Sequence, residues 1–324
     1  MIPTITATTG VTYVTVLAMA LPAASMILKF QIYAKPLPKT PRATIASTTG
    51  NIAVSIACDK EETKNLLDAA QIPVPKGDVV RTEEGLLESI NRIGYPIVIK
   101  PIDGNHGKGN TTNITTWEQA LVAFAAAKVY GKNVIVEKFI TGFDFRILVI
   151  NYKFICAALR TPASVIGDGK NTIQYLIDET NKDPRRGYGQ EKVLTQITID
   201  QFTQKMLDEK EYTLNTIPPA NELVLLKPTA NLSTGGTSTD VTDEVHPANI
   251  VMFERIAKII GLDICGIDIM ATDLRTPVTE NGGCILEVNA APGFRMHIDP
   301  SYGLPRNVAE PVVDMLFPKG SSGT

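Results

Sequence analysis

The sequence predicts an α+β fold built from one or two domains. Strand-like and helix-like patterns alternate between residues 78 and 139. Further on, two short apolar runs each carry an acidic side chain, and each run is typical of a buried strand. The chain has 324 residues and 44% hydrophobic content, which is enough to bury a sizeable core.

Caps and breakers set the order of the elements. Asp59 begins a helical pattern with acids in its first turn, as the helix dipole prefers, and Pro73 ends it. Thr82 is expected to cap the next helix, because Glu83 and Glu84 follow it. The further strands are expected at 78–81, 97–101, 111–114, 133–139, 222–227 and 264–270. The further helices are expected at 82–93, 116–130, 172–180, 200–209, 247–260 and 306–316, with a β-hairpin over 143–158.

Composition excludes several classes of protein. A net charge of -3 does not indicate the excess of positive charge that is typical of proteins that bind nucleic acid. The four cysteines form no CxxC pair, which favours reduced, buried thiols and a cytoplasmic location. The three histidines include no HExxH motif, so we do not expect a zinc hydrolase.

The N-terminal segment 1–43 is expected to be a separate segment and linker. It has no charged side chain before Lys29, and Val11–Leu28 is largely apolar. A signal peptide or a membrane span is one interpretation of this run. The absence of a basic start and the interruptions at Thr12 and Pro22 favour a buried or poorly ordered segment of a soluble protein.

Two predicted strands bring oxygen ligands together. Glu287 follows the apolar pair Ile285-Leu286, and Asn289 returns to the same face because side chains alternate along a strand. Asp268 lies inside a second apolar run, where a lone carboxylate would be costly. A shared hard dication accounts for all three residues, so the sequence predicts a Mg²⁺ site.

A lysine and a glycine loop point to an anion. Lys100 ends a buried strand and must either reach solvent or meet a negative group. Gly104, Gly107 and Gly109 allow backbone N–H groups to approach phosphate oxygens, and Lys108 adds charge. The loop matches neither a P-loop nor a Rossmann fingerprint, and a solvated turn remains the alternative.

A second strand end suits a nucleoside. The strand that ends at Glu137 and Lys138, followed by Phe139, exposes backbone groups to the edge of a purine. Asp144 lies just beyond and would accept hydrogen bonds from ribose hydroxyls. A strand that ends in solvated charges explains the pattern equally well.

Taken in order, these features resemble an ATP-grasp ligase. Four segments are similar to the ATP-grasp region of the cyanophycin synthetase family, and the similarity runs from about Thr44 to Pro318. These segments are IACDKEETKNLLDAAQIPVPKG, KPIDGNHGKGN, NLSTGGTSTDVTDEVHP and ILEVNAAPGFRMHIDPS.

The resemblance implies an ATP-grasp fold in which two α+β subdomains clamp ATP. The domain would cover 44–318, with 76–140 as the nucleotide lid, the remainder as the metal and substrate subdomain, and 319–324 as a truncated linker. Its activity would be ATP-dependent ligation: a C-terminal carboxylate is activated as an acyl phosphate, and aspartate is joined to a poly-aspartate backbone. ATP and two Mg²⁺ ions, or Mn²⁺ in their place, are the implied cofactors.

The resemblance also implies residue roles. Asp268, Glu287 and Asn289 would hold the metals, while Lys100 and Lys138 would hold the phosphates and the base. The catalytic candidates are Arg295, Lys108 and Arg146. The expected substrate-binding residues are Ser233, Thr234, Gly235, Gly236, Thr237, Arg160, Arg295 and His297. Arg185-Arg186, in the basic loop 183–189, would either contact the acidic polymer or form a solvated turn.

The sequence departs from this family at three places. It stops where a Mur-ligase-like domain is expected, it has 1–28 where an N-terminal domain is expected, and it has Gln190 where histidine is expected. The implied partners are aspartate and an acidic or Asp/Arg peptide primer, with homo-oligomers or a Mur-ligase-like domain supplied elsewhere. A glutathione-synthetase-like ligase and a non-catalytic ATP-binding module remain open as alternatives.

Overall fold

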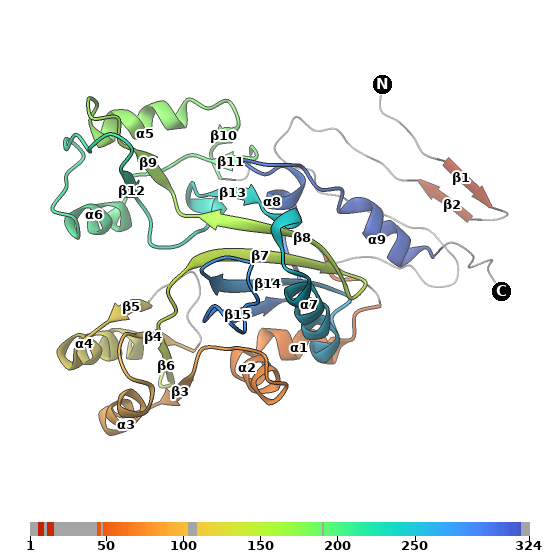
Figure 1. Cartoon of the computed structure of the whole chain (residues 1–324), viewed down its shortest axis with the longest axis horizontal. Coiled ribbons are helices and arrows are strands. Elements are labelled where there is room, and N and C mark those ends of the chain that lie inside the picture. Colours follow the sequence, from red (N-terminus) through yellow and green to blue (C-terminus); the bar gives the residue numbers. More distant parts are fainter. Residues whose placement is uncertain are drawn as a thin grey trace.

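The computed structural model describes residues 6–9, 12–15, 44–46, 48–102, 109–189 and 191–318, and for the first two segments it describes the backbone alone. Within these residues, helices accompany mainly antiparallel sheets, so the predicted α+β class is confirmed (Figure 1). Most of the apolar N-terminal run, the glycine-loop residues 103–108, Gln190 and the tail 319–324 lie outside the described residues.

The larger sheet has five antiparallel strands. Their spatial order is Thr237–Asp240 (β13), Lys153–Thr161 (β8), Phe143–Ile150 (β7), Ile264–Ala271 (β14) and Cys284–Asn289 (β15). The predicted hairpin is confirmed as β7 and β8, whose turn at Asn151 and Tyr152 has positive φ at both residues. The two acid-bearing strands, β14 and β15, are direct neighbours.

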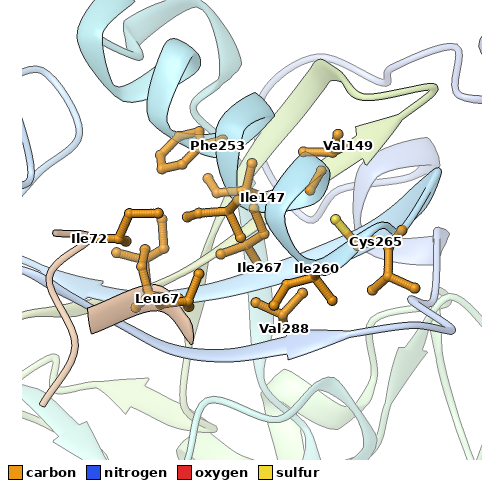
Figure 2. Packing of buried hydrophobic residues seen from close by; sticks show 14 of the residues in the cluster. Leu67, Ile72, Ile147, Val149, Phe253, Ile260, Cys265, Ile267 and Val288 are labelled. Carbon is orange, nitrogen blue, oxygen red and sulfur yellow. The ribbon is translucent and has the colours of Figure 1, made fainter. Parts of the chain in front are cut away.

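Three helices cover one face of this sheet: Asn51–Cys58 (α1), Lys60–Ala69 (α2) and Pro247–Ile260 (α7). Ile147 and Ile267 of the sheet belong to the same buried cluster as Leu67 and Phe253 (Figure 2). The structure confirms the predicted helices α2 and α7. Sequence signals for α1 are absent, because Gly50 offers no side-chain cap and no acid lies in the first turn.

The opposite face of the sheet carries Arg295–Ile298 (α8) and Ala309–Leu316 (α9). Leu148 and Ile264 form a second buried cluster there with Val312 of α9. Side chains alternate along a strand, so residues two or four positions from Leu148 and Ile264 also point to this second face. Asp144, Arg146 and Asp268 occupy such positions, and Arg160 and Glu287 lie directly opposite Asp144 and Asp268 on the neighbouring strands.

A separate four-stranded sheet lies between residues 77 and 138. Its spatial order is Gly77–Val80 (β3), Val134–Lys138 (β6), Ile97–Pro101 (β4) and Thr111–Ile114 (β5). Two helices, Glu83–Ile93 (α3) and Trp117–Lys128 (α4), pack on the face that carries Ile97, Ile99 and Val136. All six elements were predicted from the sequence, and the Thr82 side chain accepts a hydrogen bond from Gly85 N at 3.2 Å, as expected of a cap.

Residues 163–226 add a further buried cluster beside the larger sheet (Figure 1). Its helices Ile173–Asn181 (α5) and Gln201–Asp208 (α6) were predicted, as was Leu223–Leu225 (β12). The strands Ser164–Ile166 (β9), Arg186–Gly187 (β10) and Leu194–Thr195 (β11) were not, because two or three residues carry too little alternation. Two short 3₁₀ helices cover Leu232–Thr234 and Thr242–Glu244.

The backbone of the N-terminal region forms a short hairpin. Thr6–Thr9 (β1) pairs antiparallel with Thr12–Thr15 (β2), which agrees with the β-branched start of the apolar run. No helix in the part of the chain that the structure describes is long and apolar enough to cross a membrane.

A buried amide fixes the connection between β14 and β15. Asn249 in α7 is 1% exposed. Its Nδ2 donates to Leu274 O at 3.0 Å and to Thr276 O at 2.9 Å, and its Oδ1 accepts from Val278 N at 2.8 Å. The side chain therefore satisfies three backbone groups of one loop and ties that loop to the helix beneath it.

We expect Asn249→Ala to lower the free energy of unfolding by about 2 to 3 kcal/mol, because three buried backbone groups lose their partner. Urea unfolding followed by circular dichroism measures the change. The control is Asn65→Ala on the exposed side of α2, with an expected change of less than about 0.5 kcal/mol. Equal stability of the two variants would show that the loop does not depend on this side chain.

Candidate active site

The predicted metal ligands lie on one face of the larger sheet. Asp268 on β14 is directly opposite Glu287 on β15, and Asn289 is opposite Gly266, two residues before Asp268. The three side chains therefore share the face opposite to α2 and α7. The described residues contain no group of three or more His, Cys, Asp or Glu side chains arranged to hold a metal. The predicted set has only two such residues, because its third member is an asparagine.

Two arginines form ion pairs with the Asp268 carboxylate. Arg146 Nη2 donates to Asp268 Oδ2 at 3.2 Å, and Arg146 Nε also pairs with the carboxylate. Arg160 Nη2 lies 3.2 Å from the same Oδ2 and donates through Nε to Asp144 Oδ1 at 2.8 Å. The catalytic candidate Arg146, the predicted substrate-binding residue Arg160 and the predicted ribose-binding residue Asp144 thus form one ion-pair network with Asp268.

This network is largely buried. All four side chains are mostly enclosed, with exposed fractions between 12% and 22%. Burial raises the pKa of the Asp144 carboxyl, although the ion pair with Arg160 opposes that rise. Ion pairs at this depth are hydrogen-bonded and therefore well oriented.

A glycine makes room for one of the arginines. A Cβ built on Gly266 would lie 2.8 Å from Arg146 Nη1 and 2.9 Å from Pro292 Cβ. Any larger residue would displace the guanidinium or the turn that follows β15. Gly266 therefore contributes to the site because the absence of a side chain leaves space for the Arg146 guanidinium.

Helix α8 places His297 beside the arginines. His297 is 3% exposed, and its Nε2 is buried without a hydrogen-bond partner. Burial lowers the pKa of His297 to about 3, and the charge of Arg146 adds to the effect. The imidazole is therefore neutral at physiological pH. Arg295, at the start of α8, donates from Nη1 to Lys192 O at 3.1 Å.

The predicted substrate loop is held by its own hydrogen bonds. Ser233 Oγ donates to Asn231 Oδ1 at 2.9 Å, and Thr234 Oγ1 donates to Asn231 O at 3.0 Å. The N–H groups of Ser233 and Gly236 also donate to Asn231. These N–H groups are thus engaged within the loop.

Glycine is required in this loop for two different reasons. Gly235 has φ +97°, which disfavours other residues. A Cβ on Gly236 would lie 2.7 Å from Thr161 O. Thr237 continues into β13, where it pairs with Thr161.

Arg186 is a structural residue of the same region. It is 6% exposed, and its Nη1 donates to Thr195 O at 2.6 Å and to Gly235 O at 3.0 Å. The expectation that Arg186 contacts an acidic polymer or forms a solvated turn is therefore wrong. The guanidinium instead satisfies backbone carbonyls and holds the 231–237 loop.

Four of the predicted nucleotide-binding residues, Lys100, Glu137, Lys138 and Phe139, lie on or directly after strands of the four-stranded sheet. Lys100 Nζ donates to Glu137 Oε2 at 2.7 Å. Lys138 Nζ donates to Tyr95 O at 2.6 Å, and Phe139 N donates to Pro96 O at 3.0 Å. Lys138 and Phe139 are thus both tied to the turn before β4.

The structure reveals a second lysine on Glu137. Lys64 of α2 donates from Nζ to Glu137 Oε1 at 2.7 Å. Burial alone would raise the pKa of Glu137, but Lys100 and Lys64 outweigh burial and hold the pKa below its usual value. Sequence reasoning missed Lys64, because no motif singles it out; in the structure it lies on α2 beside the buried Thr63.

The glycine loop is described only at its end. Gly109 has φ +71°, and a Cβ on it would lie 2.7 Å from the Tyr130 ring. Gly104, Gly107 and Lys108 lie outside the described residues.

Comparison with known proteins places this geometry in a family. The model of the family described as "Carbamoyl-phosphate synthase L chain, ATP binding domain" matches residues 59–150. Cyanophycin synthetase of Trichormus variabilis is 52% identical over 286 residues, which are 88% of this chain and 32% of that protein. The glutathione biosynthesis bifunctional protein GshAB of Pasteurella multocida is 32% identical over 81% of this chain and 35% of its own length.

A solved structure is similar over most of the chain. The crystal structure of a bifunctional glutathione synthetase from Pasteurella multocida has a TM-score of 0.68 and 30% sequence identity, and the match covers 90% of this chain and 40% of that one. This chain spans about a third of the length of the curated relatives it matches. It has the ATP-grasp fold, and over most of its length it matches the ATP-grasp region of the cyanophycin synthetases.

Proposed function

We propose that this chain is an ATP-dependent carboxylate–amine ligase that adds aspartate to a cyanophycin-type peptide. The observation that carries the proposal is the register of β14 and β15, which puts Asp268, Glu287 and Asn289 on one face. The 52% identity to a cyanophycin synthetase supports the choice of substrate.

The three oxygen-bearing side chains fit a hard dication. Two carboxylates and one amide oxygen are ligands that Mg²⁺ accepts, and Mn²⁺ accepts the same donors. Asn289 Nδ2 is buried and has no hydrogen-bond partner, so no hydrogen bond through that atom fixes the orientation of the amide. When bound there, two such ions would offset charge on the β- and γ-phosphates of ATP.

The nucleotide is proposed to lie against the four-stranded sheet. Lys100 would contact phosphate oxygens, and the end of β6 at Lys138 and Phe139 would face the base. Gly104, Gly107, Lys108 and Gly109 are proposed to close over the triphosphate. Asp144 would accept hydrogen bonds from the ribose once it separates from Arg160.

Bond changes follow from the two substrates. A carboxylate oxygen of the peptide attacks the γ-phosphorus, and the bond from that phosphorus to the ADP oxygen breaks. The aspartate amine then attacks the acyl carbon, loses a proton, and phosphate departs with the electron pair. The acyl phosphate must be shielded from water, which a closed site between two subdomains provides.

Arginines are proposed to bind the acidic peptide. Three guanidinium groups are available for this: Arg146, Arg160 and Arg295. A planar guanidinium can bind a carboxylate through two parallel hydrogen bonds. Arg295 would also stabilise the oxyanion formed on amine attack. His297, being neutral, would orient substrate through a hydrogen bond, and the 233–237 loop would contact the peptide further out.

The proposal includes a cellular setting. The cytoplasm is proposed because Cys58, Cys156, Cys265 and Cys284 are all free. Since the relatives are about three times longer, a Mur-ligase-like domain or further copies of this chain are proposed as partners.

We expect Glu287→Gln to reduce ATP-dependent phosphate release by about a hundredfold, because one metal-facing charge is lost. Adenosine binding should persist, since the base contacts lie on the other sheet. Coupled phosphate assays and calorimetry measure the two quantities. The control is Glu280→Gln, an exposed glutamate in the loop before β15. A Glu287 variant as active as this control would remove Glu287 from the site.

We expect phosphate release only when ATP, Mg²⁺, aspartate and an aspartate–arginine peptide primer are all present. Mass spectrometry of the primer should show one added aspartate. Equal release with a glutamate–cysteine dipeptide and glycine would favour the glutathione-synthetase-like alternative, which the 32% identity to GshAB supports. Bound ATP without primer-dependent release would favour a non-catalytic module.

A further inference from the structure

One buried carboxylate sits between two lysines at the meeting point of the two sheets. Glu137 is 5% exposed, and each of its oxygens accepts from one ammonium group at 2.7 Å, from Lys64 and from Lys100. The two lysine side chains keep 20% and 28% exposure. Both lysine side chains are therefore anchored by the glutamate and remain partly exposed.

The three residues come from two different structural units. In the antiparallel pairing of β4 with β6, Val98 is opposite Glu137 and Lys100 is opposite Ile135. These four residues alternate with Ile97, Ile99 and Val136, which pack against α3 and α4, so they lie on the sheet face away from those helices. Lys64 comes from α2, whose Leu67 packs in the core of the larger sheet.

The charges of the three residues do not cancel. Lys100 with Glu137 alone would be a neutral pair, with little attraction for an anion. Lys64 brings the cluster to a net charge of +1. Because Glu137 is buried, its field on Lys100 is weakly screened by solvent, and an equally close positive charge is needed to offset it.

We propose that Lys64 is a positioning residue for nucleotide binding: it offsets the Glu137 carboxylate so that Lys100 presents an effective positive charge to phosphate. This inference rests on the proposed function. Lys64 belongs to α2, which packs on the larger sheet, and it would act through Glu137 on Lys100 of the four-stranded sheet.

The first test is calorimetric binding of Mg²⁺ with a non-hydrolysable ATP analogue, and separately of adenosine, to the full chain. Lys64→Gln should weaken binding of the analogue roughly five- to tenfold and leave adenosine binding unchanged. Lys64→Arg should bind within about twofold of wild type, since the charge is kept. The matched control is Lys258→Gln, which removes an exposed charge from α7 and should bind like wild type.

The double variant Lys64→Gln/Glu137→Gln separates charge compensation from other roles. With the carboxylate gone, Lys100 no longer needs Lys64, so the double variant should recover affinity for the analogue to within about threefold of wild type. A structural role for Lys64, or direct contact of Lys64 with phosphate, predicts no recovery.

Three results would overturn the inference. They are unchanged analogue binding in Lys64→Gln, an equal loss of adenosine binding, and a double variant as weak as the single one. If the wild-type chain binds neither ligand, the proposed function fails and this inference fails with it. Circular dichroism melts of each variant confirm that the fold is retained.

Discussion

The antiparallel register of β7, β14 and β15 is the constraint on which the site depends. It sets Arg146 opposite Asp268 and Asp268 opposite Glu287 in one row across three strands. A shift by one residue would turn these side chains into the apolar core beneath α7. That core, with Ile147 and Ile267 on the reverse face, therefore fixes the register through hydrophobic burial.

The second constraint is that the charges of the buried acidic side chains described above are balanced by nearby cations. Asp268 and Asp144 are paired with Arg146 and Arg160, and Glu137 is paired with two lysines. Each of these three carboxylates thus has a cation within contact distance, which offsets the cost of burying its charge. Under the proposed function, a phosphate, a metal ion or an acidic peptide would have to replace these ion pairs, so that binding would be linked to rearrangement of the side chains.

Local sequence signals predicted the long elements well. Helix α7 matches its predicted bounds, α2 begins directly after Asp59, where its pattern was predicted to begin, and α3 begins after its predicted cap, Thr82. Such signals failed where an element is very short, as in β10, or uncapped, as in α1. Short elements form because tertiary neighbours supply their hydrogen bonds and burial, and a local pattern does not record those neighbours.

The sequence by itself determined that Glu287 and Asn289 share a face, because that follows from the two-residue period of a strand. It also indicated that Lys100 must either reach solvent or meet an anionic partner. Only the tertiary structure decided that this partner is Glu137, shared with Lys64 from a distant helix, and that Arg186 is buried against Gly235 O. These contacts join residues far apart in the chain, so no local spacing encodes them, and chain packing alone brings them together.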